Sequence, residues 1–454
     1  MVITKSKQAN AKVETKMRET PFLETQYAKR TAKSCEMFER AKKVEPGGVS
    51  YRFRHFDPYP FFVKEAKGVT LVDLDGNEYT DYWCTHFAMI LGHAYPSVMQ
   101  AIKTQAERGW HFGLAHELEV ALSETIIRNV PSAELIRFAS SGSEANLFAM
   151  RLARTFTKRK KIAKFEGCWH GAYDPLHIAV KPPFDKSPSG GITEGSQEDT
   201  IVVPFNDLGG FLDRVKREDL ACVILEPVLG AGGMIPAEKG FLKGLREYCN
   251  SSGALLIFDE VITGFRLGLG GAQQYFGVKP DVTVLGKIIG GGLPTGAVCG
   301  RRDVMERMDH TKFSGLEYAY HGGTFAGNAI TLAAGLATID ILEHKPVYQH
   351  IDALGGKLRK RLNTIFEENG FEAQTTGIGS LFAVHTTRKQ SLKDANCYAA
   401  ANRDLSRRMF SYMLENGIFM LLPDILHGAL SYSHTDDDIE KLIFTIERYV
   451  KEKH

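Results

Sequence analysis

The stretches Ala254-Leu-Leu-Ile-Phe-Asp-Glu260 and Val282-Thr-Val-Leu-Gly-Lys287 decide the fold of this chain. Each is a short, continuously apolar run that ends in charged side chains. Such runs are typical of parallel strands covered by helices on both faces, whereas half-exposed antiparallel strands alternate polar and apolar residues. We therefore expect an α/β fold with a mostly parallel sheet.

Further patterns extend this core in both directions. The expected strands are Lys161–Phe165, Ile201–Val203 and Ala221–Leu225, and the expected helices are Leu118–Ile127, Ser143–Arg154, Phe241–Cys249, Ala329–Leu342 and Ile351–Phe366. Asp75-Gly76 between two β-rich runs predicts a hairpin near the N-terminus. We expect an N-terminal arm and small-domain segment over residues 1–85, a large cofactor-binding domain over 86–328, and a smaller C-terminal α+β domain over 329–454.

The composition excludes several classes of protein. Of the 454 residues, 43% are hydrophobic and 24% are charged, which excludes disorder, a coiled coil and collagen as descriptions of the whole chain. The 56 basic and 54 acidic residues leave a net charge of +2, so nothing favours nucleic acid or a membrane surface as a partner. The apolar runs are far shorter than the roughly 20 residues that span a bilayer. We expect a soluble protein.

The cysteines and the N-terminus indicate where the protein works. The seven cysteines are scattered and odd in number, which favours free thiols in a reducing compartment. The first twenty residues carry charges of both signs and lack the apolar stretch of a signal peptide. We expect a frayed N-terminal arm and a cytoplasmic location. Cys168 and His170 have no second pair at metal-binding spacing, so no metal is expected.

Chemically active residue types follow the ends of several expected strands. They are Ser140–Ser143 after Phe138, Trp169–Gly171 after Phe165, Glu226 after Leu225, Asp259 after Phe258, and Lys287 shortly after Leu285. Ligands of open α/β sheets bind at the carboxyl ends of the strands. We therefore expect an anion-binding helix N-terminus, an aromatic ring, carboxylates and a lysine to meet at one edge of the sheet.

Each of these residues also has a purely structural explanation. The serines could cap a helix, Trp169 could belong to the core, Asp259 could cap a turn, and Lys287 could form a salt bridge. However, burying a carboxylate behind an apolar strand is costly without a cationic partner. Burial also lowers the pKa of a lysine and makes it a Schiff-base nucleophile. Asp259 and Glu260 are neighbours on a strand, so only one of them can face the site.

One cofactor would use all four features. Pyridoxal phosphate (PLP) has a phosphate for the helix N-terminus, a flat ring for the aromatic side chain, a ring nitrogen for the aspartate and an aldehyde for the lysine. The residues by themselves therefore predict a PLP site with Lys287 and Asp259 at its centre.

Longer motifs carry a resemblance to a known family. They are Pro46-Gly47-Gly48, Leu91-Gly92-His93, Ser141–Ala145, Phe165–Gly171, Ile257–Arg266, Leu285–Pro294 and Gly323-Thr324-Phe325. With these motifs in family order from about residue 40 onward, the sequence resembles the class III (fold type I) PLP-dependent aminotransferases. It is similar to the branch of the glutamate-1-semialdehyde 2,1-aminomutases and β-amino-acid aminotransferases.

The resemblance implies roles for the matching residues. Lys287 and Asp259 would be catalytic: Lys287 forms the Schiff base and moves the proton, and Asp259 pairs with the ring nitrogen. The implied cofactor-binding residues are Ser141, Gly142, Ser143, Trp169, His170, Glu226, Asp259, Val261, Lys287, Gly323 and Thr324. The last two would reach the phosphate of a neighbouring subunit, so a homodimer with shared active sites is expected.

The sequence departs from the aminomutases at several positions. Trp169 stands where they carry Tyr, and Ile425-Leu426 stands where they carry Phe-Glu. Loss of that carboxylate counts against intramolecular amino exchange, in which a diamine intermediate must be retained. Arg52 or Arg54 would hold a substrate carboxylate, and Tyr51 and Leu426 would suit an apolar side chain. Each of these four could also be plain surface or core.

The predicted function is amino-group transfer from an amino acid to a 2-oxo acid, with β-amino and aromatic or apolar amino acids as the candidate donors. It would proceed by ping-pong half-reactions through Lys287, with the amino donor and the oxo acid as partners. Glutamate-1-semialdehyde 2,1-aminomutase is the alternative from the same family. A PLP-binding protein without catalytic activity is a remote third possibility.

Overall fold

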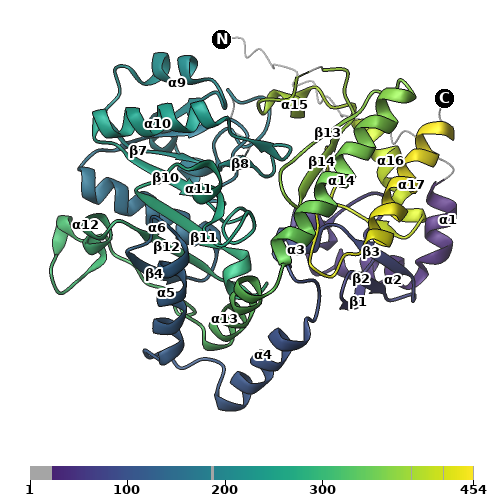
Figure 1. The fold of residues 1–454 in the computed structure, drawn as a ribbon, viewed down its shortest axis with the longest axis horizontal. Helices are drawn as coiled ribbons and strands as arrows, with labels where there is room; N and C mark the ends of the chain where they lie inside the picture. Colours follow the sequence, from purple (N-terminus) through teal and green to yellow (C-terminus); the bar gives the residue numbers. More distant parts are fainter. Residues whose placement is uncertain (1–22, 186–188, 390, 423, 453–454) are drawn as a thin grey trace, which may run out of the picture.

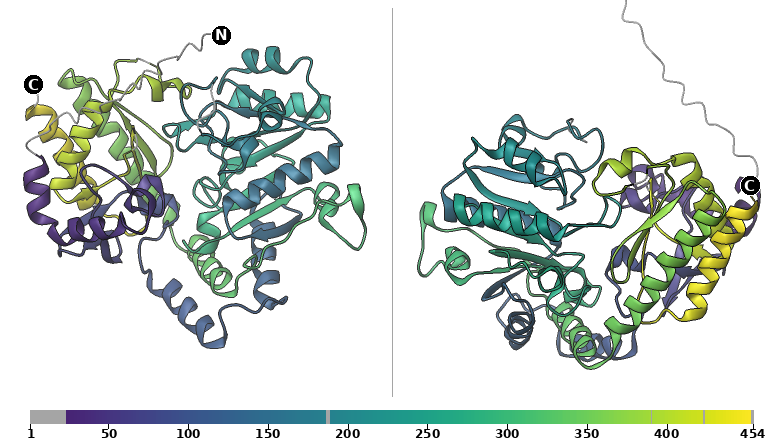
Figure 2. Two further views of the ribbon diagram at one scale, coloured as in Figure 1. Left: turned by 180° about the vertical axis from the view of Figure 1, so that it is seen from behind. Right: turned by 45° about the horizontal axis from the view of Figure 1, so that its top comes forward.

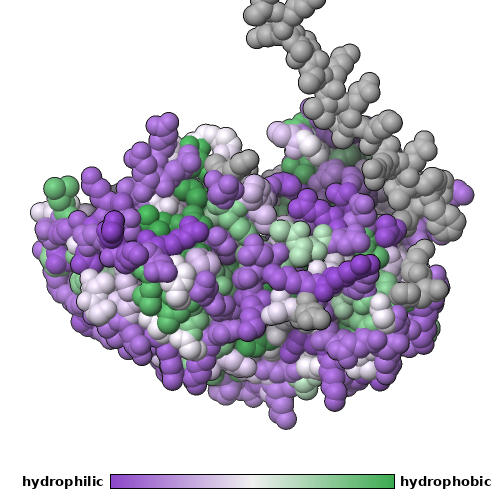
Figure 3. Space-filling view, turned by 90° about the horizontal axis from the view of Figure 1, so that it is seen from above, coloured by the Kyte–Doolittle hydropathy of each residue, from purple (hydrophilic) through white to green (hydrophobic). Residues whose placement is uncertain are grey.

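The computed structural model describes residues 23–185, 189–389, 391–422 and 424–452, which form two lobes (Figure 1). The large lobe contains the middle of the chain, and the small lobe combines the N-terminal segment with the C-terminal third. The two lobes stand side by side in the further views as well (Figure 2). The predicted N-terminal arm lies mostly outside the described residues. Seen from above, the surface is predominantly hydrophilic, with hydrophobic patches confined to smaller areas (Figure 3).

A seven-stranded sheet forms the centre of the large lobe. Its strands, in spatial order, are β4 (Leu135–Ala139), β12 (Gly296–Gly300), β11 (Val282–Gly286), β10 (Leu255–Asp259), β7 (Leu220–Leu225), β5 (Lys161–Phe165) and β6 (Thr200–Val203). Neighbours from β11 to β6 pair in parallel, whereas β12 is antiparallel to both β4 and β11. The predicted parallel sheet is therefore present. Strand β12 was not predicted, because its glycine-rich sequence lacks a strand pattern.

Helices cover both faces of this sheet, as the apolar strands require. Alternate residues of β10 point to opposite faces: Leu255 and Ile257 pack with helix α6 (Gly142–Thr157), and Leu256 and Phe258 pack with residues of α10 (Lys239–Ser252). The other helices of the large lobe are α4 (Pro96–Arg108), α5 (Glu117–Asn129), α7 (Asp174–His177), α8 (Glu194–Glu198), α9 (Leu208–Val215), α11 (Gly271–Phe276), α12 (Arg302–Met305) and α13 (Ala329–His344). Short pieces include the strands β8 (Val228–Leu229) and β9 (Ile235–Pro236) and the 3-10 helices η3 (Lys287–Gly290), η4 (Glu306–Met308) and η5 (Gly315–Glu317).

The small lobe has one hydrophobic core built from both ends of the chain. Tyr79 and Tyr82 from the N-terminal segment pack in the same cluster as Leu358, Phe382 and Ile443. Its sheets are β1 (Val63–Lys67), β2 (Thr70–Asp73), β3 (Glu78–Asp81) and β15 (Ile418–Phe419), and β13 (Gln374–Thr376), β14 (Leu381–His385) and β16 (Leu426–Ala429). Its helices are α1 (Leu23–Arg30), α2 (Ala32–Ala41), η1 (Pro46–Gly48), η2 (Arg52–Arg54), α3 (Cys84–Phe87), α14 (Val347–Glu368), α15 (Asn396–Ala399), α16 (Arg403–Glu415) and α17 (Asp436–Glu452).

The division into domains stays a proposal, with one refinement from the packing. Helix α13 packs against α4, α5 and η3 of the large lobe, although the sequence placed it in the C-terminal domain. We therefore propose a boundary near His344 rather than after residue 328. Among the described residues, no helix is both long enough and apolar enough to cross a membrane.

Candidate active site

Asp259 ends strand β10 on the face that α6 covers. It follows Leu255 and Ile257 in the alternation of the strand, so its carboxylate points toward α6. There its Oδ2 lies 2.7 Å from His170 Nδ1 and accepts a hydrogen bond of 2.8 Å from Asn146 Nδ2. Its Oδ1 accepts from the backbone N–H of Val261 at 3.0 Å. Three donors thus orient a carboxylate that is only 4% exposed.

The neighbouring carboxylate points the other way. Glu260 accepts hydrogen bonds from the backbone N–H groups of Ala272 and Gln273 and from the side chains of Gln273 and Thr263. These donors belong to the turn after β10 and to α11. Glu260 therefore organises the loop, and of this pair Asp259 is the carboxylate that lies on the α6 side of the sheet.

Lys287 directly follows strand β11, the neighbour of β10 in the sheet. Asp259 pairs with Val284 in the register, so Lys287 stands just past the same edge. Its backbone is left-handed, with φ of 52°. Burial lowers the pKa of the Lys287 amine, while the negative charges of Asp259 and Glu226 act in the opposite direction. No hydrogen bond or ion pair of the Lys287 side chain is present within the described part of the chain.

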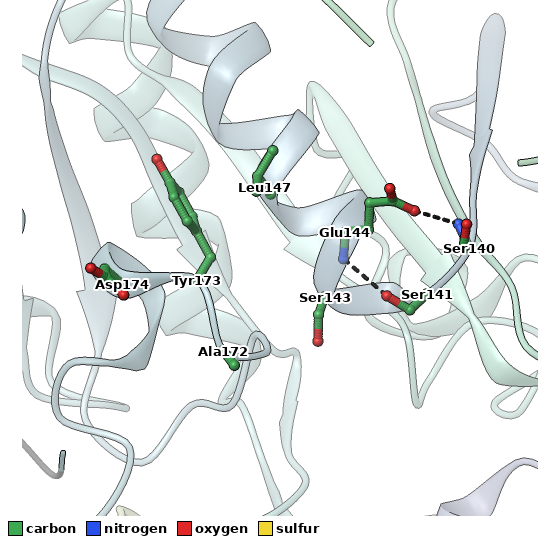
Figure 4. A pocket seen from close by; sticks show the side chains of 8 residues that line it. All are labelled: Ser140, Ser141, Ser143, Glu144, Leu147, Ala172, Tyr173 and Asp174. Carbon is green, nitrogen blue, oxygen red and sulfur yellow. Dashed lines mark hydrogen bonds between the residues drawn. The ribbon is translucent and has the colours of Figure 1, made fainter. Parts of the chain in front are cut away.

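An open pocket lies at the N-terminus of α6. Ser140, Ser141, Ser143, Glu144 and Leu147 line one side, and Ala172, Tyr173 and Asp174 line the other (Figure 4). Ser141 caps the helix, because its Oγ accepts from the backbone N–H of Glu144 at 3.2 Å. The N–H groups of Gly142 and Ser143 have no acceptor among the described residues. A helix N-terminus of this kind binds anions such as phosphate.

Glycines let this helix terminus approach the strand ends closely. A Cβ atom on Gly142 would lie 2.8 Å from Cγ2 of Val261, and a Cβ on Gly171 would lie 2.2 Å from Oγ of Ser143. Both distances are shorter than side chains tolerate. Val261, the loop that follows β5, and the N-terminus of α6 therefore form one compact group.

Glu226 holds the loop that carries Trp169. Its Oε2 accepts from the Trp169 N–H at 2.7 Å, and its Oε1 accepts from the Gly230 N–H at 3.2 Å. Burial, reinforced by the charge of Asp259, raises the pKa of Glu226 to about 8. The ring of Trp169 meets that of His177 edge-on at 5.5 Å. Glu226 thus holds this loop through its backbone N–H groups and not through the Trp169 side chain.

The two candidate arginines have different surroundings. Both are exposed residues of η2. Burial raises the pKa of Tyr51, and the charge of Arg54 opposes this effect. Burial lowers the pKa of His86, and the charges of Lys287 and Arg54 lower it further. The charge of Arg52 acts instead on the pKa of Tyr398 in α15. Arg54 and Tyr51 are therefore associated with His86, whose ring lies 5.3 Å from that of Tyr51.

Two other predicted groups lie elsewhere. Leu426 is fully buried in the small-lobe core, whereas its neighbour Ile425 packs toward the large lobe. A substrate contact from the Leu426 side chain therefore has no support in the structure. Gly323 and Thr324 are exposed, and a Cβ on Gly323 would lie 3.1 Å from Oε1 of Glu144. They lie beside the mouth of the α6 pocket in their own subunit.

Sequence reasoning missed two residues of this site. Asn146 was not among the expected site residues, yet its amide donates a hydrogen bond to Asp259. Its position one turn into α6 and the direction of Asp259 could have revealed it. His86 carried no signal, because a pattern does not reveal that Cys84–Phe87 forms a left-handed turn.

The residues present fit pyridoxal phosphate. The α6 terminus offers unpaired N–H groups, Lys287 offers an amine with a lowered pKa, and Asp259 retains capacity for one more hydrogen bond beyond its three. Two buried polar atoms beside Asp259, Asn146 Oδ1 and His170 Nε2, have no hydrogen-bond partner among the described residues. The phosphate of PLP would match the N–H groups of α6, its carbonyl carbon would match the Lys287 amine, and its protonated ring nitrogen would match Asp259.

Comparison with known proteins supports the same cofactor. The family model for class-III aminotransferases matches residues 52–450. The chain is 42% identical to the glutamate-1-semialdehyde 2,1-aminomutase of Ignicoccus hospitalis over 430 residues, which cover 92% of this chain and 99% of that protein.

Two solved structures have the same fold. An omega-transaminase from Sphaerobacter thermophilus is 36% identical with a TM-score of 0.86, and the alignment covers 92% of this chain and 97% of that one. A β-phenylalanine aminotransferase from Variovorax paradoxus is 32% identical with a TM-score of 0.85, covering 95% and 96%. The predicted fold type I architecture and the predicted PLP dependence are thereby confirmed.

Proposed function

This chain belongs to the class-III aminotransferases, a family of PLP-dependent enzymes, and we propose that it transfers amino groups to and from substrates that carry a carboxylate. One observation carries the proposal: Lys287 and Asp259 follow two adjacent parallel strands, and Asp259 contacts α6 near its phosphate-binding end. This arrangement brings an amine, a carboxylate and an anion site to one edge of the sheet.

The residues of the chain would divide the work as follows. When bound, PLP supplies an electron sink for the carbon atom that loses its proton. Lys287 would hold the cofactor covalently and, once released, accept and return that proton. Its lowered pKa increases the fraction of neutral amine available for this step. Asp259, oriented by His170 and Asn146, would keep a proton on the ring nitrogen.

Two reactions of this class remain candidates. The comparisons favour the aminomutase over the intermolecular aminotransferase that the sequence analysis put first, because the curated relatives at about 40% identity are named as aminomutases. The apolar pair Ile425-Leu426 favours the aminotransferase, since neither side chain offers a charge to retain a diamine. The similarity to transaminases at 32% and 36% identity also supports the aminotransferase reaction.

Arg54 is the proposed partner of the substrate carboxylate in either reaction. Its charge acts on the pKa of His86, and its side chain forms no ion pair with any described residue. Arg52 is the matched control, because it is an equally exposed neighbour whose charge acts on the pKa of Tyr398 instead.

We also propose that the enzyme is a homodimer. Trp110, Phe112, Leu114 and Phe325 form an exposed apolar patch, with exposed fractions from 44% to 78%. The two segments lie together, because Asn328 donates to the Trp110 carbonyl and the ring of His111 contacts Phe325 at 5.2 Å. A second copy would cover this patch, which adjoins Gly323 and Thr324 in the chain.

The visible absorbance spectrum of the purified holoenzyme tests the proposal. An amino acid added without an acceptor should bleach the cofactor band if the enzyme is an aminotransferase, and α- and β-amino donors should be compared. A response to glutamate-1-semialdehyde or a diamine analogue alone would identify the aminomutase. A protein that takes up no PLP, or whose band responds to none of these compounds, would refute the proposed function.

A further inference from the structure

The segment Cys84–Phe87 forms a left-handed turn without glycine. The φ angles of Cys84, Thr85, His86 and Phe87 are 47°, 51°, 55° and 68°. Each such residue is unfavourable for an L-amino acid, and four in succession are rare. Backbone of this kind persists only where its surroundings hold it, and it concentrates at functional sites.

Several contacts hold the turn in place. Asp81 Oδ1 accepts hydrogen bonds from the backbone N–H groups of Trp83 and Cys84 at 2.8 and 3.1 Å. At the other end, the buried guanidinium of Arg266 donates to the Phe87 carbonyl at 2.6 Å and to the Leu430 carbonyl at 3.2 Å. The turn is therefore fixed between the large lobe and the small lobe.

The turn sets the position of the His86 side chain. The imidazole lies between two aromatic rings, 5.3 Å from Tyr51 and 4.3 Å from Trp83. Burial and the positive charges of Lys287 and Arg54 lower its pKa to about 4, so it is neutral at physiological pH. Within the described part of the chain, neither ring nitrogen forms a hydrogen bond, and neither is fully shielded from solvent.

The surroundings of this imidazole favour an anion. The guanidinium of Arg54 is a permanent cation that lowers the pKa of His86, and no carboxylate is among the charges that shift this pKa. A neutral imidazole still carries one N–H donor, and the flanking rings supply an apolar wall. A carboxylate that pairs with Arg54 would therefore meet a second donor on the turn.

We propose that His86 is a specificity-determining residue that donates a hydrogen bond to the substrate carboxylate held by Arg54, and that Tyr51 and Trp83 flank the adjoining part of the substrate. The inference rests on the proposed function, because it concerns the substrate side of the same site. The left-handed turn is the device that places the imidazole there.

Binding of an unreactive ligand to the holoenzyme tests this proposal. The probe is 3-phenylpropanoate, which lacks an amino group, and the matched neutral probe is 3-phenylpropan-1-ol, both titrated by calorimetry. His86→Phe keeps a ring but removes the donor. His86→Asn keeps a donor and suits the left-handed backbone. Should His86→Phe fail to fold, His86→Gly is a second donor-free variant that adopts this backbone freely.

The donor-free variants should bind the carboxylate at least about tenfold more weakly than wild type, because a hydrogen bond to a charged group is lost. His86→Asn should stay within about threefold of wild type. The ratio of carboxylate to alcohol affinity should fall only in the donor-free variants. An unchanged ratio in them, or a wild-type enzyme that binds neither probe, would overturn the proposal. Bleaching of wild-type enzyme by amino donors, recorded separately, reports on the proposed function itself.

Discussion

Replacing Asp259 by Asn tests the central geometry of the site against a control that the chain itself provides. In the variant, one amide group replaces a carboxylate that accepts three hydrogen bonds. Whichever way the amide points, its NH2 faces at least one N–H donor, either that of Val261 or those of Asn146 and His170. A buried donor left without a partner costs about 1–3 kcal/mol, so we expect the free energy of unfolding of the apoprotein to fall by about that amount.

Cofactor affinity should fall as well, because the amide cannot keep a proton on the ring nitrogen. A hydrogen bond between charged groups contributes about 1.5–3 kcal/mol, which corresponds to a PLP dissociation constant about ten- to a hundredfold higher. Glu260→Gln is the matched control. Among the described residues, the Glu260 carboxylate accepts bonds only from donors in the turn and in α11. Its replacement by an amide should therefore lower stability to a similar extent and leave cofactor affinity unchanged.

Urea unfolding of the two apoproteins and absorbance titration with PLP measure both quantities. The reasoning fails if Asp259→Asn binds PLP as tightly as wild type. It fails equally if Glu260→Gln weakens PLP binding to the same degree, because the two carboxylates would then not have separate roles.

Four further predictions concern single residues. Lys287→Ala should keep the far-ultraviolet circular dichroism spectrum and lose the bleaching of bound cofactor by amino donors; normal turnover would refute its role. Arg54→Ala should raise KM for a carboxylate substrate about tenfold or more, and Arg52→Ala should leave it within about twofold in the same steady-state assay. Burial lowers the pKa of His385 to about 3, so between about pH 6.5 and 3 the unfolded chain alone binds a proton there. Between pH 6.5 and pH 5, the contribution of His385 to the free energy of unfolding should therefore decrease by about 2 kcal/mol. Urea titrations at both pH values should show that His385→Gln removes this decrease. Trp110→Glu should shift the protein from dimer toward monomer in light scattering, and an unchanged mass would contradict the proposed interface.

Residue types at strand ends made the site predictable. The apolar runs before Asp259 and Lys287 predicted buried parallel strands. Because parallel strands of one sheet end at the same edge, the side chains that follow them lie close together. The serines at the start of α6 were recognisable because capping chemistry is local in the sequence. The same logic could not find β12, whose residues Gly296–Gly300 become a strand only by pairing with β4 and β11.

Side-chain direction and unusual backbone needed the tertiary structure. The sequence showed that Asp259 and Glu260 cannot point the same way, but the donors that bind each carboxylate were visible only in the structure. It placed Leu426 near the substrate, although the side chain packs in the small-lobe core. It contained no sign of His86, because the left-handed turn that carries it also depends on distant residues such as Arg266.

The sequence by itself determined the fold class and the cofactor, because these depend on periodicity and on chemistry carried within short segments. Only the tertiary structure showed which donors bind Asp259 and Glu260, and that the ring of His86 lies beside that of Tyr51. Those features depend on contacts between segments far apart in the chain, and a linear pattern does not encode the direction of a side chain across such contacts.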